Sequence, residues 1–250
     1  MVFHKSRQGF ISFSARGQLL QKTSLRARAE NKPVLFSALL LSLLVLCVLS
    51  GCEFKQKPEE GPDYLVLVNK THLISESYIR SVTLREVPDV YGDVCRMEAQ
   101  TLDAYNALRD ALAAKGIEIG VDFSYRSVEE QEEIMRDFTE KYGEEYAKRT
   151  VAVPGTSEHH TGLAVDIVPK VDGEWVSENE DMLKETEIFR VIHETLPDYG
   201  FILRYPEGKE AITGYDYEPW HLRFVGKEAA KEIMDAGLTL EEYTEQKNAG

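Results

Sequence analysis

The chain has 250 residues, of which 43% are hydrophobic and 29% charged, and its formal net charge at pH 7 is −14. This length is sufficient to bury a sizeable core. The acidic balance disfavours nucleic acid and other anionic surfaces as partners, because like charges repel.

The first 52 residues have the composition of a secretory signal. A basic region precedes the uncharged apolar stretch Val34–Ser50, whose 17 residues are short for a membrane span. The stretch ends in Leu-Ser-Gly-Cys52, which resembles a bacterial lipobox and predicts cleavage before Cys52 and lipidation of its thiol. A retained membrane anchor is the alternative. We therefore expect a protein anchored by lipid at the extracytoplasmic face of a bacterial cell membrane.

Cleavage at this point would change both the charge and the cysteine content. The first 52 residues hold seven Lys or Arg residues and one Glu, so the net charge would fall from −14 to −20. Of the three cysteines, Cys47 lies in the apolar stretch, Cys52 is the predicted lipid site, and Cys95 alone remains. The mature protein then has no intramolecular disulfide. Cys95 is interpreted as a buried apolar residue, and it has no His partner motif that would indicate a thiol hydrolase.

A tether and one α+β domain are predicted after Cys52. Residues 53–63 are charged and contain prolines, which is typical of a tether. Residues 64–250 show no repeat and no further break, so we expect one domain that acts as a monomer. Helices around a small, antiparallel sheet indicate the α+β class. In chain order, the predicted elements are a strand at Tyr64–Val68, a helix at Glu98–Lys115 ended by Gly116, a strand at Ile117–Tyr125, a charged helix at Val128–Arg149 interrupted at Gly143, a strand at Leu163–Val168, a helix at Glu180–Leu196, strands at Phe201–Tyr205 and Leu222–Val225, and a helix at Lys227–Ala236 ended by Gly237.

The segment Ser157–Asp166 reads Ser-Glu-His-His-Thr-Gly-Leu-Ala-Val-Asp and combines a histidine with a buried acid. Asp166 lies within an apolar run, and an aspartate in a buried strand is costly unless it is paired or bound to metal. His159 lies in the loop before this strand. Gly162 would allow the backbone to turn sharply, so that His159 and Asp166 point to one place.

A second segment, Glu218-Pro-Trp-His221, is interpreted as a loop that leads into another strand. The two segments together offer two imidazoles, one carboxylate ligand and one spare carboxylate. A catalytic zinc ion requires this set: three protein ligands, an open position for water and a general base beside it.

These motifs resemble the VanY-type zinc D-alanyl-D-alanine carboxypeptidases and the related LD-carboxypeptidases of peptidoglycan recycling. The pattern Ser-x-His-x-x-Gly-x-Ala-x-Asp followed by Glu-Pro-Trp-His carries the resemblance, which covers roughly residues 64–230. It implies the Hedgehog/D,D-peptidase type of fold, with zinc at one face of the sheet. Further motifs agree in the same order: Ser124-Tyr125-Arg126-Ser127 with Gln131, Val153-Pro154-Gly155, Arg204-Tyr205-Pro206, Gly208-Lys209 and Thr213-Gly214.

Carried over by position, the resemblance implies His159, Asp166 and His221 as the ligands of one Zn²⁺ ion and Glu218 as the catalytic base. Arg126 would polarise the scissile carbonyl and stabilise the oxyanion.

Other positions are implied to contact the substrate. Gln131 and Ser157 match positions that hold the peptide, and Tyr125 belongs to the motif of the catalytic arginine. His160 stands where family members commonly carry Gln, and it is interpreted as a residue at the rim of the site or behind it. Trp220 either walls the pocket or belongs to the core.

The predicted function is the removal of the terminal D-alanine from peptidoglycan stem peptides by a D,D-carboxypeptidase. LD-carboxypeptidase action on tetrapeptide stems remains open, because the two activities share these motifs. An endopeptidase that cuts cross-links and a non-catalytic peptidoglycan-binding module are further alternatives.

Overall fold

The computed structural model describes residues 61–249. The predicted signal at 1–52 and most of the tether at 53–63 lie outside the described residues. Within the described range, no helix combines the length and the apolar character that a membrane crossing needs.

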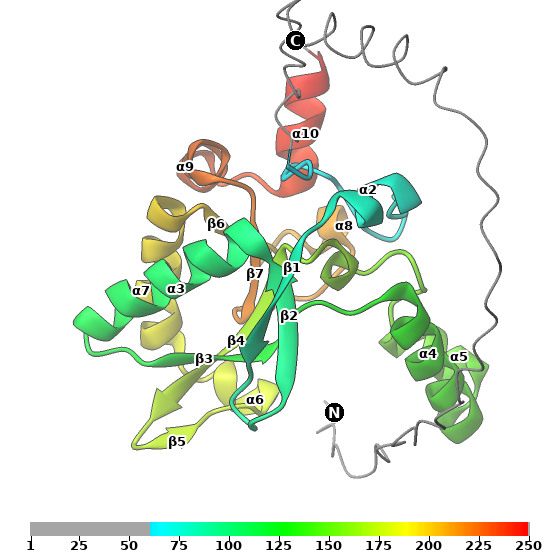
Figure 1. Cartoon of the computed structure of the whole chain (residues 1–250), viewed down its shortest axis with the longest axis horizontal. Coiled ribbons are helices and arrows are strands. Elements are labelled where there is room, and N and C mark those ends of the chain that lie inside the picture. The colour runs from blue at the N-terminus through cyan, green and yellow to red at the C-terminus, as the bar shows by residue number, and fades with distance from the viewer. Residues whose placement is uncertain (1–60, 250) are drawn as a thin grey trace, which may run out of the picture. The chain divides into compact units, whose positions relative to one another are not determined.

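The centre of the domain is a five-stranded antiparallel sheet (Figure 1). The strand order is β3-β4-β7-β6, and β5 pairs with the far end of β4. A separate hairpin, β1–β2, lies in front of this sheet in Figure 1. The strands are β1 Leu84–Pro88, β2 Val94–Glu98, β3 Ile119–Phe123, β4 Ala164–Val171, β5 Glu174–Trp175, β6 Phe201–Leu203 and β7 His221–Phe224.

Helices surround the sheet, which confirms the predicted α+β class. Figure 1 shows α3 and α7 together on one side and the α4–α5 pair on the other. The α-helices are α2 Glu76–Ser81, α3 Ala99–Ala114, α4 Val128–Tyr142, α5 Glu144–Thr150, α6 Asn179–Met182, α7 Thr186–Thr195, α8 Glu210–Thr213, α9 Lys227–Ala236 and α10 Leu240–Ala249. Two 3₁₀ helices, η1 Glu158–Thr161 and η2 Leu196–Tyr199, complete the described elements.

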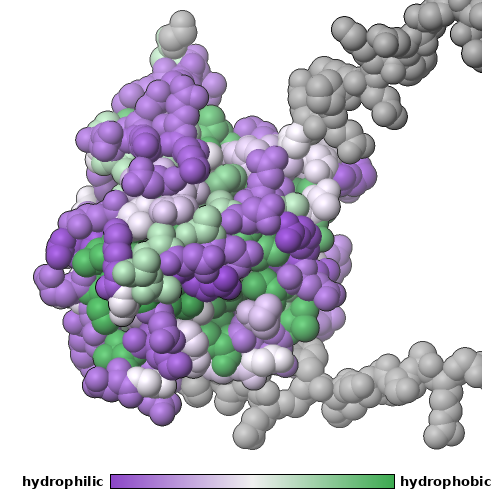
Figure 2. All heavy atoms as spheres, turned by 60° about the vertical axis from the view of Figure 1, so that its left-hand side comes forward, coloured by the Kyte–Doolittle hydropathy of each residue, from purple (hydrophilic) through white to green (hydrophobic). Residues whose placement is uncertain are grey.

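The buried apolar residues form two clusters. The larger lies between the sheet, α3 and α7, with Leu108, Leu112, Ile167 and Ile192 at its centre, all fully buried. The smaller joins β6 to α9 and α10 through residues such as Ile233. Hydrophilic side chains cover much of the face drawn in Figure 2, with apolar patches between them. The apolar side chains of the sheet therefore pack into a buried core, which holds the strands in fixed positions.

Several predicted elements are confirmed, and their ends have local causes. The carboxylate of Glu98 accepts a hydrogen bond from the Thr101 backbone N–H and caps α3. Gly116 follows this helix with φ 81°, a conformation that favours glycine. Gly143, with φ 87°, divides the charged helix into α4 and α5, as its position predicted.

The predicted strand at Tyr64–Val68 is wrong. This segment forms a turn and an irregular stretch. Its alternating side chains do pack on two sides, with Tyr64 and Val66 on the larger cluster and Leu65 on the smaller. However, the carbonyls of Tyr64 and Val66 accept hydrogen bonds from the side chain of Arg223 and not from a neighbouring strand. The apolar run Tyr64–Val68 therefore reflects burial on two sides without strand pairing.

The predicted helix at Glu180–Leu196 is broken. It divides into α6 and α7, and the chain turns at Leu183–Glu185. Glu185 has φ −80° and ψ 45°, outside the helical region. The segment contains no Gly or Pro that would have indicated the break.

Candidate active site

Three strands place one residue each in a single row across the sheet. Asp166 of β4 lies opposite Phe123 of β3 and opposite His221 of β7. Residues that face each other across antiparallel strands project from the same side of the sheet. The sheet register therefore brings Asp166 and His221 together, although 55 positions separate them in the sequence.

His159 reaches the same place from η1. Gly162 ends this short helix in the left-handed conformation with φ 72°. A Cβ atom at this position would lie 3.0 Å from Leu84 Cδ2 and 3.3 Å from the Glu98 backbone nitrogen. The tight turn thus needs glycine, and it directs the chain from His159 into β4, as predicted.

The potential ligand atoms of His159, Asp166 and His221 lie within 4.8 Å of one another. Asp166 Oδ2 is 3.3 Å from His159 Nε2, and Asp166 Oδ1 is 2.9 Å from His221 Nδ1. The two imidazole rings meet edge to face, with 5.0 Å between their centroids. Two imidazoles and one carboxylate form a donor set that suits zinc.

The electrostatics favour a cation at this point. Burial opposes charge on His221, but Asp166, Glu158 and Glu218 raise the pKa of its imidazole to about 10. Burial also opposes charge on Asp166, yet the two histidines hold the pKa of its carboxyl well below the usual range. A metal ion supplies the positive charge that this cluster favours, and the histidines are then neutral ligands.

One of the unpaired buried atoms near these ligands fits the same ion. Four buried side-chain atoms here have no hydrogen-bond partner among the described residues: Glu158 Oε2, His159 Nδ1, Asp166 Oδ1 and His221 Nε2. An unpaired buried polar atom costs about 1–3 kcal/mol. A cation between the three ligands would satisfy Asp166 Oδ1.

Glu218 lies beside the cluster without joining it. The backbone turns between Glu218 and His221, whose N–H donates to the Glu218 carbonyl over 3.1 Å. The turn leaves Glu218 Oε2 3.9 Å from His221 Nδ1, and the Glu218 side chain is 30% exposed. Burial, opposed by His221 and assisted by Asp166, raises the pKa of the Glu218 carboxyl to about 7. Such a group can both accept and release a proton near neutral pH.

Arg126 is held by Gln131 and by its own backbone. Its Nη1 donates to Gln131 Oε1 over 2.6 Å, and its backbone N–H donates to the His159 carbonyl over 3.1 Å. The guanidinium also lies 4.2 Å from the ring centroid of Phe123, which packs on His159 at 5.0 Å. These contacts place Arg126 next to the group formed by His159, Asp166 and His221, the histidine cluster.

His160 points away from this cluster and is 1% exposed. Its Nε2 accepts from the Gly155 N–H over 3.1 Å, so Nδ1 carries the proton and donates to the Arg126 carbonyl over 2.7 Å. The structure therefore places His160 behind the site, one of the two positions that its sequence allowed.

The other predicted substrate contacts are placed differently. Gln131 is fully buried, and Trp220, at 8% exposure, belongs to the larger apolar cluster. The structure thus favours the core interpretation of Trp220. Ser157 is buried at the start of η1, whereas Tyr125 is half-buried beneath the Arg96 guanidinium, 5.0 Å from its ring centroid.

Sequence reasoning missed a group of buried charges behind His221. Glu158 is 2% exposed and accepts from Arg204 and Arg223, which are both fully buried. Burial would raise the pKa of the Glu158 carboxyl, but the two guanidinium groups hold it well below its usual range. The available signal was an arginine directly after one strand, Phe201–Leu203, and another inside β7, since arginines buried in a sheet need an acid.

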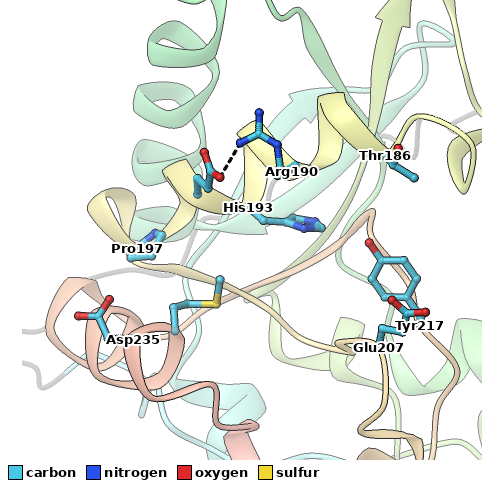
Figure 3. A pocket seen from close by; sticks show the side chains of 9 residues that line it. Thr186, Arg190, His193, Pro197, Glu207, Tyr217 and Asp235 are labelled. Atoms are coloured by element: carbon cyan, nitrogen blue, oxygen red, sulfur yellow. Dashed lines mark hydrogen bonds and ion pairs between the residues drawn. The ribbon is translucent and has the colours of Figure 1, made fainter.

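A cavity of about 570 Å³ is lined by residues of α7 and α9 and by Tyr217, which directly precedes Glu218. His193 projects from α7 into it, and Tyr217 lines the opposite wall (Figure 3). His193 Nε2 donates to the Pro219 carbonyl over 2.9 Å. This contact ties the loop that carries Glu218 to α7.

Comparison with known proteins agrees with this geometry. A D-alanyl-D-alanine carboxypeptidase of Enterococcus faecalis (strain ATCC 700802 / V583) is 38% identical over 200 residues, which are 76% of this chain and 68% of the relative. The LdcB LD-carboxypeptidase has a similar structure, with a TM-score of 0.65 and 39% identity over 76% of this chain and 88% of LdcB. The vancomycin-resistance D,D-pentapeptidase VanY, solved with Zn(II), matches with a TM-score of 0.59 and 38% identity over 72% of this chain and 98% of VanY.

The family model described as "VanY: D-alanyl-D-alanine carboxypeptidase" matches residues 95–227, more than half of the chain. The match spans β2 to the start of α9 and includes every residue of the histidine cluster. The chain belongs to the VanY family of D-alanyl-D-alanine carboxypeptidases.

Proposed function

We propose that the chain is a zinc-dependent D,D-carboxypeptidase that removes the terminal D-alanine from peptidoglycan stem peptides and acts as a monomer. The observation that carries this proposal is a spare carboxylate, Glu218, 3.9 Å from one of three converging ligands. A non-catalytic binding module has no need of such a base.

His159, Asp166 and His221 would hold the Zn²⁺ ion through two imidazole nitrogens and one carboxylate oxygen. When bound, zinc supplies Lewis-acid chemistry, which activates water and polarises the scissile carbonyl. Phe123 packs on His159, and Tyr205 stacks on His221 with 4.8 Å between centroids. These rings hold the imidazoles in place and exclude water from their flanks.

Glu218 acts as the general base and then as the general acid. Its carboxylate takes the proton of the attacking water and passes it to the amine of the departing D-alanine.

Arg126 stabilises the oxyanion that develops on the scissile carbonyl. Preorganised donors are effective in this role because they need not reorient during the reaction. The hydrogen bond to Gln131 Oε1 supplies such preorganisation.

The choice between D,D and L,D bonds rests on the residue before the scissile bond. That residue is D-alanine in a pentapeptide stem and the L-centre of a diamino acid in a tetrapeptide stem. The relatives include proteins named for each activity, such as VanYB in complex with D-alanine-D-alanine and LdcB. We favour D,D activity because the chain carries the full VanY-like set of motifs.

The test is a side-by-side measurement of kcat/KM on pentapeptide and tetrapeptide stems. We expect the pentapeptide to be preferred. A preference of more than about tenfold for the tetrapeptide, equal to about 1.4 kcal/mol in the transition state, would reverse the choice and leave the zinc chemistry intact.

The lipobox-like Leu-Ser-Gly-Cys52 supports anchoring by a diacylated Cys52 at the outer face of a bacterial membrane. Two acyl chains anchor stably where one is marginal. Cys52→Ser should prevent processing or release the protein, measured by intact mass and membrane fractionation. Unchanged mass and membrane retention would support a retained apolar anchor.

A further inference from the structure

One buried carboxylate has no place in the mechanism above. Glu158 Oε2 lies 3.6 Å from His221 Nε2, the ring nitrogen on the far side from Asp166. Neither atom has a hydrogen-bond partner among the described residues. Because each is buried and polar, each needs a partner, and the nearest suitable atom is the other.

The orientation of Glu158 is fixed by two arginines. Its Oε1 accepts from Arg204 Nε and from Arg223 Nη1, both over 2.7 Å. Arg223 follows His221 by two positions on β7, so both side chains project from the same side of the strand. With Oε1 occupied by two guanidinium groups, Oε2 is left to face His221.

The two arginines also form hydrogen bonds with residues that are distant in the sequence. Arg204 makes a bidentate pair with Glu241 of α10, over 2.8 and 2.6 Å. Arg223 Nη2 donates to the carbonyls of Tyr64 and Val66. Both guanidinium groups are fully buried. The carboxylate behind His221 is therefore held by a rigid network and not by a mobile surface contact.

We propose that Glu158 is a positioning residue that keeps the proton of His221 on Nε2 and leaves Nδ1 as the zinc ligand. A neutral imidazole carries one N–H, and a carboxylate acceptor beside Nε2 selects the tautomer with the proton there. The same contact stops the ring from rotating away from Asp166. Partners of this kind behind a ligand typically change metal affinity by about 10–100-fold. The role rests on the proposed zinc function.

The test compares Glu158→Gln with Glu241→Gln in the full chain. Each variant removes one negative charge that faces Arg204, but only Glu158 faces His221. In Glu158→Gln the two guanidinium groups retain the amide oxygen, so the amide N–H₂ group points at Nε2 and favours a proton on Nδ1.

We expect zinc affinity, measured by competition with a chromophoric chelator, to fall at least about tenfold in Glu158→Gln and less than about threefold in Glu241→Gln. An affinity of Glu158→Gln within about threefold of wild type, or equal losses in both variants, would overturn the role. Wild-type protein that binds no zinc would refute the proposed function, whereas tight binding with an unaffected Glu158→Gln refutes the positioning role alone.

A measurement on wild-type protein avoids any folding defect of the variant. In the Co²⁺-substituted protein labelled with ¹⁵N-histidine, the N–H of His221 should reside on Nε2 and exchange slowly with solvent, since Nε2 is buried. An N–H on Nδ1 would contradict the proposal.

Discussion

The guanidinium of Arg126 donates from Nη1 to Gln131 Oε1 over 2.6 Å, and the Gln131 amide in turn donates to the Ala152 carbonyl over 2.8 Å. Gln131 is fully buried in α4. Both ends of its amide are therefore occupied by the protein. This geometry assigns Gln131 to the support of Arg126, whereas its motif had predicted a substrate contact.

This relationship predicts strong coupling between the two residues. Arg126→Ala should lower kcat by about 10²–10³-fold, the usual cost of one oxyanion donor. Gln131→Ala should cost less, and the double variant should resemble Arg126→Ala alone, because both changes remove one unit. Steady-state kinetics of the four proteins give the coupling. Additive losses would show that Gln131 acts independently.

Glu218→Gln should retain zinc and lose about 10²–10⁴-fold in kcat, since the amide cannot accept the proton of water. Elemental analysis and single-turnover kinetics check the two parts. Zinc loss in this variant would make Glu218 a ligand, and a rate within a few-fold of wild type would exclude it as the base.

Asp166→Ala should abolish stoichiometric zinc binding, because it removes the carboxylate that both histidines face. Asp216→Asn is the matched control, since Asp216 is an exposed acid close to Glu218. Metal content after dialysis is the readout. Full occupancy in Asp166→Ala would count against the ligand assignment.

His160→Gln should retain near wild-type activity, whereas His160→Leu should not. A glutamine amide can replace both hydrogen bonds of the imidazole, accepting from Gly155 and donating to the Arg126 carbonyl. Leucine can make neither, so Arg126 loses its backbone support and kcat should fall by about tenfold or more. Equal activity of the two variants would show that the hydrogen bonds are dispensable.

His193 should make stability depend on pH. Burial lowers the pKa of its imidazole in the folded protein, although the hydrogen bond to the Pro219 carbonyl opposes the shift. Below about pH 6.5, the ordinary value, the unfolded chain then binds more protons than the folded one. The free energy of unfolding should thus be highest, with respect to His193, above that pH, and it should decrease as the pH falls below it. Urea unfolding of wild type and His193→Gln between pH 5 and 7.5 measures how the free energy of unfolding of each protein depends on pH. The same pH dependence in both proteins would contradict the prediction.

The sequence predicted the parts of the fold that have local causes. The helix now designated α3 has a continuous apolar face between Glu98 and Gly116, and Gly143 marks a real interruption. The break at Leu183–Glu185 has no local signal in the sequence, and the irregular path of Tyr64–Val68 depends on tertiary contacts. The hydrogen bonds of Arg223, which decide the second case, come from a residue more than 150 positions away.

The sequence likewise predicted the motif residues of the candidate site but not the residues that support them. The spacing of His159, Asp166, Glu218 and His221 follows from the sheet register and two tight turns. The motifs in the sequence therefore indicated that these four residues lie together. The positions of Gln131 and Glu158 were not contained in the motifs, because a side chain that supports a functional group is defined by packing. Glu158 lies next to His159 in the chain, and only the folded positions of Arg204, directly after β6, and Arg223, within β7, reveal which way it faces.

The hydrogen bonds from Arg223 to the carbonyls of Tyr64 and Val66 also limit how far the protein can be shortened from its N-terminal side. A version trimmed past Val66 would deprive a fully buried guanidinium of two acceptors, on the strand that begins with His221. Asp63 belongs to the same unit, because its carboxylate accepts from the Leu65 N–H over 2.9 Å. A soluble form for crystallisation or assay should therefore start before Asp63. Cutting a few residues later would loosen the catalytic centre from a distance, although no catalytic residue would be missing.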